Sequence, residues 1–167
     1  MNINPVDPYE TMKMKTLILG MGNDILTDDA IGPLLINDLS GIIGNRDVDF
    51  NIAFCGGLEI IEYISGYEKV IFIDGIHTNG GIPGDVYYYK PSDFQETSHL
   101  SSLHDITFLT SLKLGHTLGI QLPTDLHIIA IEIVEDMEFS MELTLPLKKR
   151  YPEILKEVIA KINAILD

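Results

Sequence analysis

The chain has 167 residues and a formal net charge of −14, which comes from 25 acidic and 11 basic side chains. A chain of this length can bury the core of a single domain, and a hydrophobic content of 46% is typical of a globular protein. The acidic surface would repel nucleic acid, and no apolar run approaches the roughly 20 residues of a membrane helix, so we expect neither as a partner. Acidity aids solubility and could also attract a basic partner.

The ends and the single cysteine bear on domain organisation and compartment. Residues 1–15 contain two prolines and no apolar core, which is typical of a flexible N-terminal arm rather than a signal peptide. Residues 16–167 show no repeat, low-complexity tract or change of composition, so we predict a single α/β domain there. Cys55 is the only cysteine, which excludes a disulfide within the chain and fits a reducing compartment. We therefore expect a cytoplasmic protein.

The first half of the domain alternates strand and helix signals. Residues 16–20 (TLILG) form a short apolar run that ends in glycine, as a buried strand does. The acids at 28–29 and Pro33 mark the start of a helix, because acids favour the N-cap and proline fits the first turn. Residues 48–54 alternate apolar and polar side chains, which predicts a second strand, and a helical spacing follows over residues 58–65.

The second half continues the alternation. Residues 70–74 (VIFID) predict a buried strand that ends on an acid, and residues 85–90 (DVYYYK) are a β-prone segment that could be an antiparallel edge strand. A helix is expected from His104, the strongest strand over residues 126–134 (LHIIAIEIV), and a last helix from Pro146. This order predicts a three-layer α/β/α sandwich with a mostly parallel, twisted sheet.

Two acids are expected at the edge of the sheet where open α/β folds bind ligands, beyond the carboxyl ends of the strands. Asp29 follows the first strand and Asp74 ends the strand over residues 70–74. Asp29 could instead cap the following helix, and Asp74 could form a turn with Gly75. Two carboxylates and an imidazole are a ligand set for a divalent metal that leaves positions open for water or substrate.

Five histidines could supply that imidazole. His127 lies in a predicted strand and His116 in a predicted helix, which favours structural roles for both. His77, His99 and His104 flank loops at the expected ligand edge, and spacing alone does not choose among them. His104 begins a helix after a serine-rich loop, so its ring can project into a cleft.

A longer motif resembles a known family. Residues 19–32 (LGMGNDILTDDAIG) are similar to the opening motif of the hydrogenase maturation proteases, a Gly-x-Gly-Asn turn followed by paired acids and a glycine. The resemblance continues through the strand over residues 70–75, the segment 102–105 (SLHD) and the strand over residues 126–134 with the acidic loop after it. It covers roughly residues 15 to 165, nearly the entire chain.

The resemblance implies an endopeptidase that removes a short C-terminal peptide from the nickel-loaded precursor of a nickel–iron hydrogenase large subunit. It implies metal contacts at Asp29, Asp74 and His104, with proton transfer by Asp29 or Asp74. Nickel would come with the precursor, so no permanently bound cofactor is expected. The substrate-binding positions implied in the same way are Gly22, Asn23, Cys55, Gly56 and Gly57.

The chain departs from the family pattern in two places. It carries aspartate at position 29, where many members carry glutamate, and residues 54–59 (FCGGLE) replace the usual acid, glycines and threonine. The second departure concerns a region thought to help choose the substrate, so the identity of the hydrogenase stays open.

Three alternatives remain at this point. A non-catalytic chaperone of the same fold could bind the precursor without cleaving it. A small nucleotide-binding domain would use Gly20 and Gly22, but the third glycine of that fingerprint is absent and the acids at the helix start would repel phosphate. A Cys–His protease would need Cys55 as nucleophile, whereas a serine hydrolase lacks its Gly-x-Ser-x-Gly elbow.

Overall fold

The computed structural model describes residues 15–44, 47–54, 57–93 and 103–167, and for residues 103–109 it describes the backbone only. The described chain forms one five-stranded sheet in the order β2-β1-β3-β5-β4. The strands are β1 (Thr16–Met21), β2 (Val48–Ala53), β3 (Lys69–Ile76), β4 (Val86–Tyr89) and β5 (Asp125–Glu132). β1, β2, β3 and β5 pair in parallel, and β4 pairs antiparallel with β5 at one edge.

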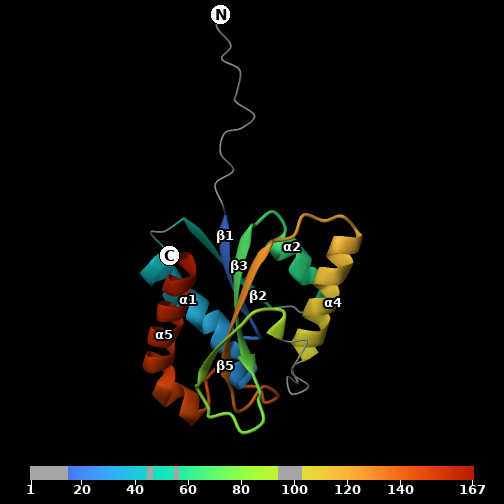
Figure 1. The fold of residues 1–167 in the computed structure, drawn as a ribbon. Helices are drawn as coiled ribbons and strands as arrows, with labels where there is room; N and C mark the ends of the chain where they lie inside the picture. The colour runs from blue at the N-terminus through green and yellow to red at the C-terminus, as the bar shows by residue number, and fades with distance from the viewer. Residues whose placement is uncertain (1–14, 45–46, 55–56, 94–102) are drawn as a thin grey trace, which may run out of the picture.

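Helices cover both faces of the sheet, as Figure 1 shows. α1 (Ile31–Ile43) and α5 (Leu145–Leu166) lie on one face, and α2 (Ile60–Ile64) and α4 (Leu103–Thr117) lie on the other. Two short 3-10 helices, η1 (Thr27–Ala30) and η2 (Gly57–Glu59), precede α1 and α2. The predicted three-layer α/β/α sandwich with an antiparallel edge strand is therefore confirmed.

Two apolar clusters hold the layers together. The cluster on the α1/α5 side contains one face of the strands, for example Ile18 of β1, Ile71 of β3 and Ile129 of β5. These side chains pack against helix residues such as Leu35 and Val158. The other side contains the neighbouring strand positions, among them Leu17, Phe72 and Ile128, packed against Ile60 and Ile64 of α2. Successive strand residues point to opposite faces, and a strand covered on both faces reads as a continuous apolar run. This is why VIFI in β3 shows no alternation of apolar and polar residues.

Some details differ from the sequence-based expectations. The predicted strand over residues 48–54 ends one residue earlier, at Ala53, and the helix predicted over residues 58–65 is divided into η2 and α2. Phe54 and Leu58 are 57% and 55% exposed, whereas Ile60 of α2 is buried. Apart from Lys15, the predicted arm at residues 1–15 lies outside the described residues. Within the described part of the chain, every helix is too short or too polar to cross a bilayer.

Candidate active site

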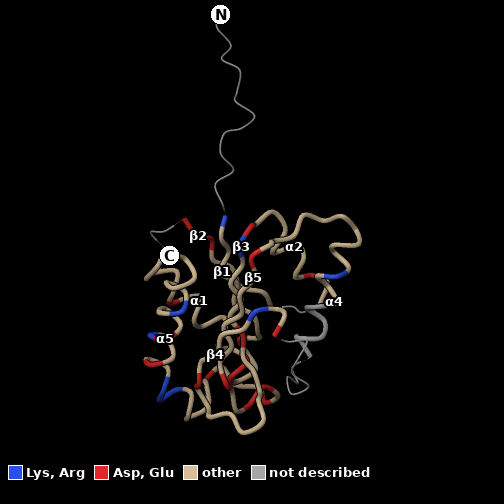
Figure 2. The backbone as a smooth tube through the Cα atoms, in the orientation of Figure 1, with Lys and Arg blue, Asp and Glu red and all other residues tan. Residues whose placement is uncertain are grey.

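The carboxyl ends of the parallel strands meet at the lower edge of the sheet in Figure 1. η1 follows β1 here, η2 follows β2, and the segment from Val134 to Thr144 connects β5 with α5. Figure 2 shows that acidic residues gather around this edge, which we call the carboxyl edge. It is the edge at which the sequence predicts a site.

The glycine turn after β1 lets η1 and α1 pack against the sheet. A Cβ atom on Gly22, whose φ is +135°, would lie 1.9 Å from the backbone oxygen of Asp29. One on Gly20 would lie 2.7 Å from the oxygen of Gly32, and one on Gly32 would lie 2.1 Å from the oxygen of Met21. The glycines thus serve close helix–strand contact. Since backbone oxygens fill the space above the turn, a phosphate cradle of the nucleotide-binding type is not favoured.

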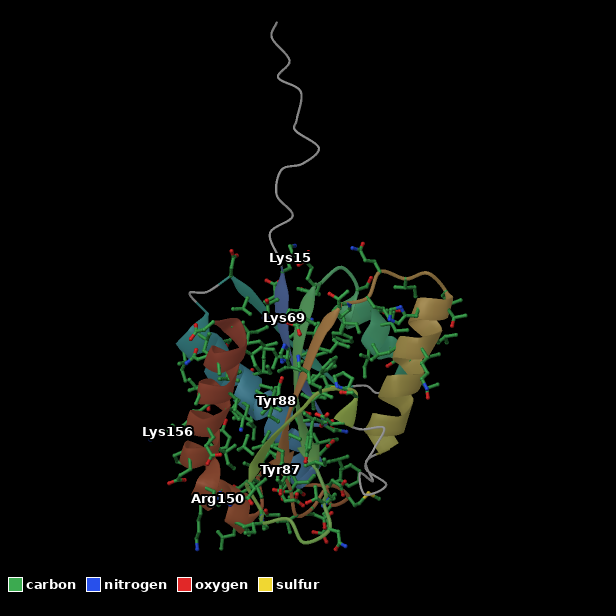
Figure 3. All side chains as sticks on the ribbon, viewed as in Figure 1. Lys15, Lys69, Tyr87, Tyr88, Arg150 and Lys156 are labelled. Carbon is green, nitrogen blue, oxygen red and sulfur yellow. The ribbon has the colours of Figure 1, made fainter. Side chains whose placement is uncertain are left out.

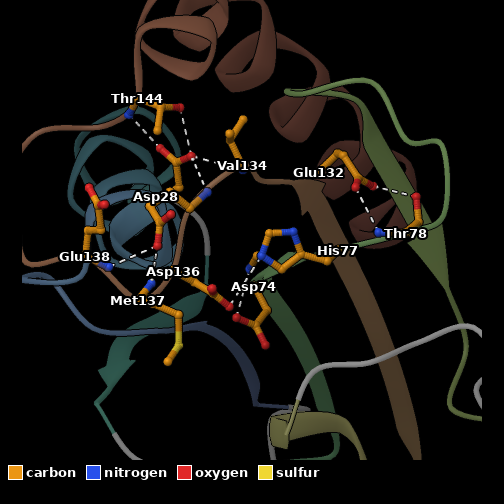
Figure 4. A network of polar contacts seen from close by, with 12 residues as sticks. Asp28, Asp74, His77, Thr78, Glu132, Val134, Asp136, Met137, Glu138 and Thr144 are labelled. Atoms are coloured by element: carbon orange, nitrogen blue, oxygen red, sulfur yellow. Dashed lines mark hydrogen bonds and ion pairs between the residues drawn. The ribbon is translucent and has the colours of Figure 1, made fainter.

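Of the paired acids, Asp28 is the buried one. Its side chain is 0% exposed and accepts four hydrogen bonds, from the N–H groups of Val134, Glu135 and Thr144 and from Thr144 Oγ1. Figure 4 shows this carboxylate enclosed by the segment that follows β5. The capping positions of η1 and α1 are Leu26 and Ala30, which make no side-chain cap, so the expected acidic N-cap is wrong.

Asp29 is the half-buried neighbour, in η1 at the carboxyl edge. Asp28 N–H donates to the oxygen of Glu135 and Asp29 N–H to that of Leu26, so the backbone of both acids is fixed. Asn23, a predicted substrate-binding residue, shapes the preceding turn because its Oδ1 accepts the Ile25 N–H at 3.2 Å. This local order holds position 29 in place.

Asp74 lies inside β3 rather than after it. Its strand continues through Gly75 and Ile76, which pair with Ile131 and Glu132 of β5, so the alternative of an Asp74–Gly75 turn is wrong. The half-buried side chain accepts the Gly75 N–H at 2.8 Å. Asp74 occupies the strand face that Phe72 shares, which is the face covered by α2 and α4.

His104 lies in the first turn of α4, on the same side of the sheet as Asp74. α4 ends at Thr117 and the chain then enters β5 at the opposite edge, so its first turn stands near the carboxyl edge. The backbone therefore brings the predicted positions Asp29, Asp74 and His104 to one edge of the sheet. The His104 side chain lies outside the described residues, as do the predicted positions His99, Cys55 and Gly56, while Gly57 opens η2 with a φ of +73°.

His77, the other candidate imidazole, lies just past β3. Its Nε2 is 3.4 Å from Oδ2 of Asp136, and both side chains are partly exposed. Figure 4 shows this pair between the carboxylates of the edge. Across the side chains that the structure describes, no three His, Cys, Asp or Glu residues come close enough to hold a metal ion.

Glu132 is a buried acid that the sequence analysis did not single out. Its side chain is 3% exposed and accepts the N–H of Thr78 at 2.8 Å and the hydroxyl of Thr78 at 2.7 Å. These bonds fix the chain after His77, and burial raises the pKa of the neighbouring Tyr87. An acid within the apolar run IIAIEIV was the signal for such a role, because a buried carboxylate needs hydrogen-bond donors.

Comparisons with known proteins agree with this geometry. A family model described as hydrogenase maturation protease matches residues 53–161. Among solved structures, the hydrogenase maturating endopeptidase HybD from E. coli aligns with 90% of this chain and 93% of its own, at 23% identity and a TM-score of 0.69. The nickel–iron hydrogenase maturation protease HybD from Thermococcus kodakarensis aligns over 89% and 99%, at 24% identity and a TM-score of 0.67. The sequence comparison with curated proteins gives no match.

Proposed function

The chain belongs to the hydrogenase maturation protease family, and from this premise we propose that Asp29, Asp74 and His104 form the site that cleaves its precursor. As a member of this family it is an endopeptidase that processes the C-terminus of a hydrogenase large subunit. The finer proposal is that it acts on the nickel-loaded precursor, in the cytoplasm, and recognises the nickel itself. The observation that supports this proposal is that η1, the end of β3 and the start of α4 lie toward the same edge of the sheet.

The donor set fits a divalent metal of borderline character. Two carboxylates and one imidazole suit nickel, and the absence of a thiolate from the set leaves thiolate ligation to the precursor. The nickel is then part of the substrate, and the protein needs no permanently bound cofactor. Bound at this edge, it would anchor the tail of the precursor and polarise the scissile carbonyl.

The two carboxylates differ in how they are supported. Asp74 pairs with Ala130 of β5, and the residues before it in β3 also pair with β1, so its backbone is well held, and Asp29 is held by the short turn after β1. Peptide hydrolysis adds water across the scissile bond and needs a group that removes a proton from that water. We assign this step to Asp29 or Asp74, since each is a half-buried carboxylate at the edge.

The direct experiment is incubation of purified protein with nickel-loaded precursor, followed by mass measurement of the precursor. We expect the loss of a C-terminal peptide, and we expect Asp74→Asn to abolish it. Asp24→Asn is the matched control, because Asp24 is an exposed acid of the turn that leads to η1. Normal cleavage by Asp74→Asn would reject the role of Asp74, and binding without cleavage by the wild type would indicate a non-catalytic chaperone.

Two further variants separate the histidines and the metal. His104→Ala should abolish cleavage, whereas His77→Ala should retain most of it, because the imidazole that contacts the nickel is assigned to His104. The reverse result would move the imidazole to His77 and its partner Asp136. Nickel-free precursor should stay uncut, and its cleavage at an equal rate would contradict nickel recognition while leaving the protease activity intact.

A further inference from the structure

The segment between β5 and α5 displays large apolar side chains to solvent. Met137, Phe139 and Met141 are 79%, 81% and 82% exposed. Three further apolar side chains at the same edge are also exposed: Leu145 is 64% exposed, Ile25 45% and Val134 44%. We call these six residues the apolar rim: Met137, Phe139, Met141, Leu145, Ile25 and Val134. Exposed apolar patches that are rimmed by polar residues mark interaction sites in soluble proteins.

The backbone of this segment is firmly held, so the exposure is not that of a loose loop. Asp28 binds both of its ends, at Val134 and at Thr144. Its middle pairs with the turn after β1, where Thr27 N–H donates to the oxygen of Ser140 at 2.9 Å and Thr27 Oγ1 donates to that of Glu138 at 2.6 Å. A fixed backbone presents the rim side chains in one arrangement, which lowers the entropic cost of binding.

The charge of the segment selects the partner. Residues 135–142 (EDMEFSME) contain four acids and no basic residue. Hydrogen bonds from the N–H groups of Met137 and Glu138 lower the pKa of Glu135, so its carboxylate stays charged near neutral pH. A partner for this surface needs apolar side chains flanked by lysine or arginine. A second copy of the chain fits poorly, because a two-fold contact would bring the acids of both segments together.

The surface also offers a recess for an anchoring side chain. Met141 and Leu34 line a pocket of about 400 Å³ between α1 and α5, and Lys148 and Tyr151 of α5 line it as well. Side chains that fill such pockets carry much of the binding energy in protein interfaces. The apolar rim and the recess therefore form one continuous surface beside the carboxyl edge.

We infer that the apolar rim is the docking surface for the folded body of the hydrogenase precursor, which contacts it through apolar and basic side chains while the tail enters the carboxyl edge. This inference rests on the proposed function, because it names where the same substrate binds. The buried carboxylate of Asp28 links the two regions, since it fixes the rim segment and is the chain neighbour of Asp29.

The test replaces the rim side chains by serine in the variant M137S/F139S/M141S. All three are exposed, so folding should be retained, and circular dichroism checks it. With full-length nickel-loaded precursor we expect KM to rise at least tenfold while kcat at saturation stays within twofold. The matched control is I42S/L118S, which removes two exposed apolar side chains at the opposite edge of the sheet, 54% and 65% exposed, and should leave KM unchanged.

A binding measurement separates failure of the docking surface from failure of the proposed function. Asp74→Asn protein, with and without the rim substitutions, is titrated with the precursor by calorimetry, which does not depend on cleavage. A tenfold weaker Kd for the rim variant supports docking even if the wild type proves inactive. An unchanged Kd overturns it, and so does a loss confined to kcat.

Charge and self-association complete the test. Glu138→Lys should weaken binding, and added salt should weaken binding to the wild type more than binding to this variant, because Glu138 is exposed on the rim segment. If salt weakened binding equally for the wild type and for Glu138→Lys, the inference that the partner is basic would be overturned. Sedimentation of the protein alone should give a monomer, and a dimer that dissociates in the rim variant would assign the surface to a second copy instead.

Discussion

At the residue scale, Asp28 stabilises the carboxyl edge through the hydrogen bonds that its carboxylate accepts. Its two carboxylate oxygens accept four hydrogen bonds in a site fully closed to solvent. Thr144 precedes α5 and would be a natural N-cap, but its hydroxyl donates to Asp28 and makes no cap. The position that begins the last helix is thus used to connect that helix with η1.

We predict that Asp28→Asn destabilises the fold by about 2–4 kcal/mol. The asparagine side chain has only one acceptor oxygen, and its NH2 group would face the N–H donors that now bind the carboxylate. Urea denaturation followed by circular dichroism measures the change. Asp24→Asn is the control and should stay within about 0.5 kcal/mol, since Asp24 is exposed. Equal stability of the two variants would contradict a structural role for Asp28.

The sequence could predict that an acid pair stands at this edge but could not assign the two roles. Asp28 and Asp29 are adjacent and alike in local sequence, and the donors that separate them lie 106 to 116 residues further along the chain. The same limit applies to Glu132, whose partner Thr78 lies 54 residues away. Local patterns report which residue types reach an edge, whereas long-range hydrogen bonds decide which of them is buried.

His127 is a second residue whose role depends on burial. Its ring is buried on β5, with Nδ1 2.9 Å from the hydroxyl of Tyr88 and Nε2 2.9 Å from Oδ1 of Asp125. Burial lowers the pKa of His127 below its usual value of 6.5, against the opposing effect of Asp125. Burial alone would raise the pKa of Asp125, but hydrogen bonds from His127 and Lys90 lower it to about 2.

These shifts predict lower stability in acid. Because the folded pKa of His127 is depressed, the unfolded chain binds its proton first, so stability is fully present above pH 6.5 and is lost as the pH falls below it. Asp125 adds a loss at lower pH, between about 4 and 2. Thermal unfolding between pH 7.5 and 5 should show a smaller decrease in Tm for His127→Gln than for the wild type. The exposed-residue control His116→Gln should follow the wild type, and identical slopes for all three proteins would contradict the prediction.

At the scale of elements, the turn between β1 and α1 couples stability to the candidate site. The glycine positions of this turn are set by close approach of backbone atoms, with Gly22 against the oxygen of Asp29 and Gly20 against that of Gly32. Any side chain at Gly22 must displace η1, which carries Asp29. The glycines of the turn therefore leave room for η1 to pack close to β1, and this packing sets the position of Asp29.

We predict that Gly22→Ala destabilises the protein by about 2–4 kcal/mol and greatly reduces cleavage, because both the positive φ and the contact with Asp29 are unfavourable. Gly66→Ala is the matched control, since Gly66 has a φ of +83° but open space around its Cβ position, so it isolates the conformational cost. Gly41→Ala in α1 should instead stabilise by about 0.5–1 kcal/mol. Urea denaturation and the processing assay measure these effects, and equal losses for Gly22→Ala and Gly66→Ala would contradict the close-approach argument.

The order and type of the elements could be predicted because the signals are periodic and local. Strands such as β1 and β5 and the helix start before Pro146 match the expected segments within a few residues. The end of β3 could not be predicted, since Gly75 and Ile76 remain in the strand only because they pair with β5. The helix predicted over residues 58–65 begins instead as the short 3-10 helix η2, and α2 covers only Ile60–Ile64.

At the scale of the whole molecule, charge is unevenly distributed. Figure 2 shows many acids around the carboxyl edge, whereas basic residues lie along α5 and, beside further acids, at the opposite edge. Figure 3 places Lys15 and Lys69 at that opposite edge, while Arg150 of α5 reaches the carbonyl oxygen of Pro83 and the carboxylate of Asp85. The composition predicted the excess of acid, and only the fold shows that much of it surrounds the candidate site.

This distribution leads to a prediction about salt. A net charge of −14 makes the folded chain repel itself, and repulsion between exposed charges is screened over distances beyond the Debye length. At pH 7.5 we expect the Tm to rise as NaCl increases from about 0.02 M to about 0.3 M, which shortens the Debye length from roughly 20 Å to roughly 6 Å. Near pH 4.5, the isoelectric point of the sequence, the rise should largely disappear because the net charge is close to zero. An equal rise at both pH values would show that salt acts on apolar burial rather than on repulsion. Charge reversal at Glu138, within the acid-rich segment 135–142, should reduce the salt dependence at pH 7.5, which would locate part of the repulsion at the same edge that is proposed to bind a basic partner.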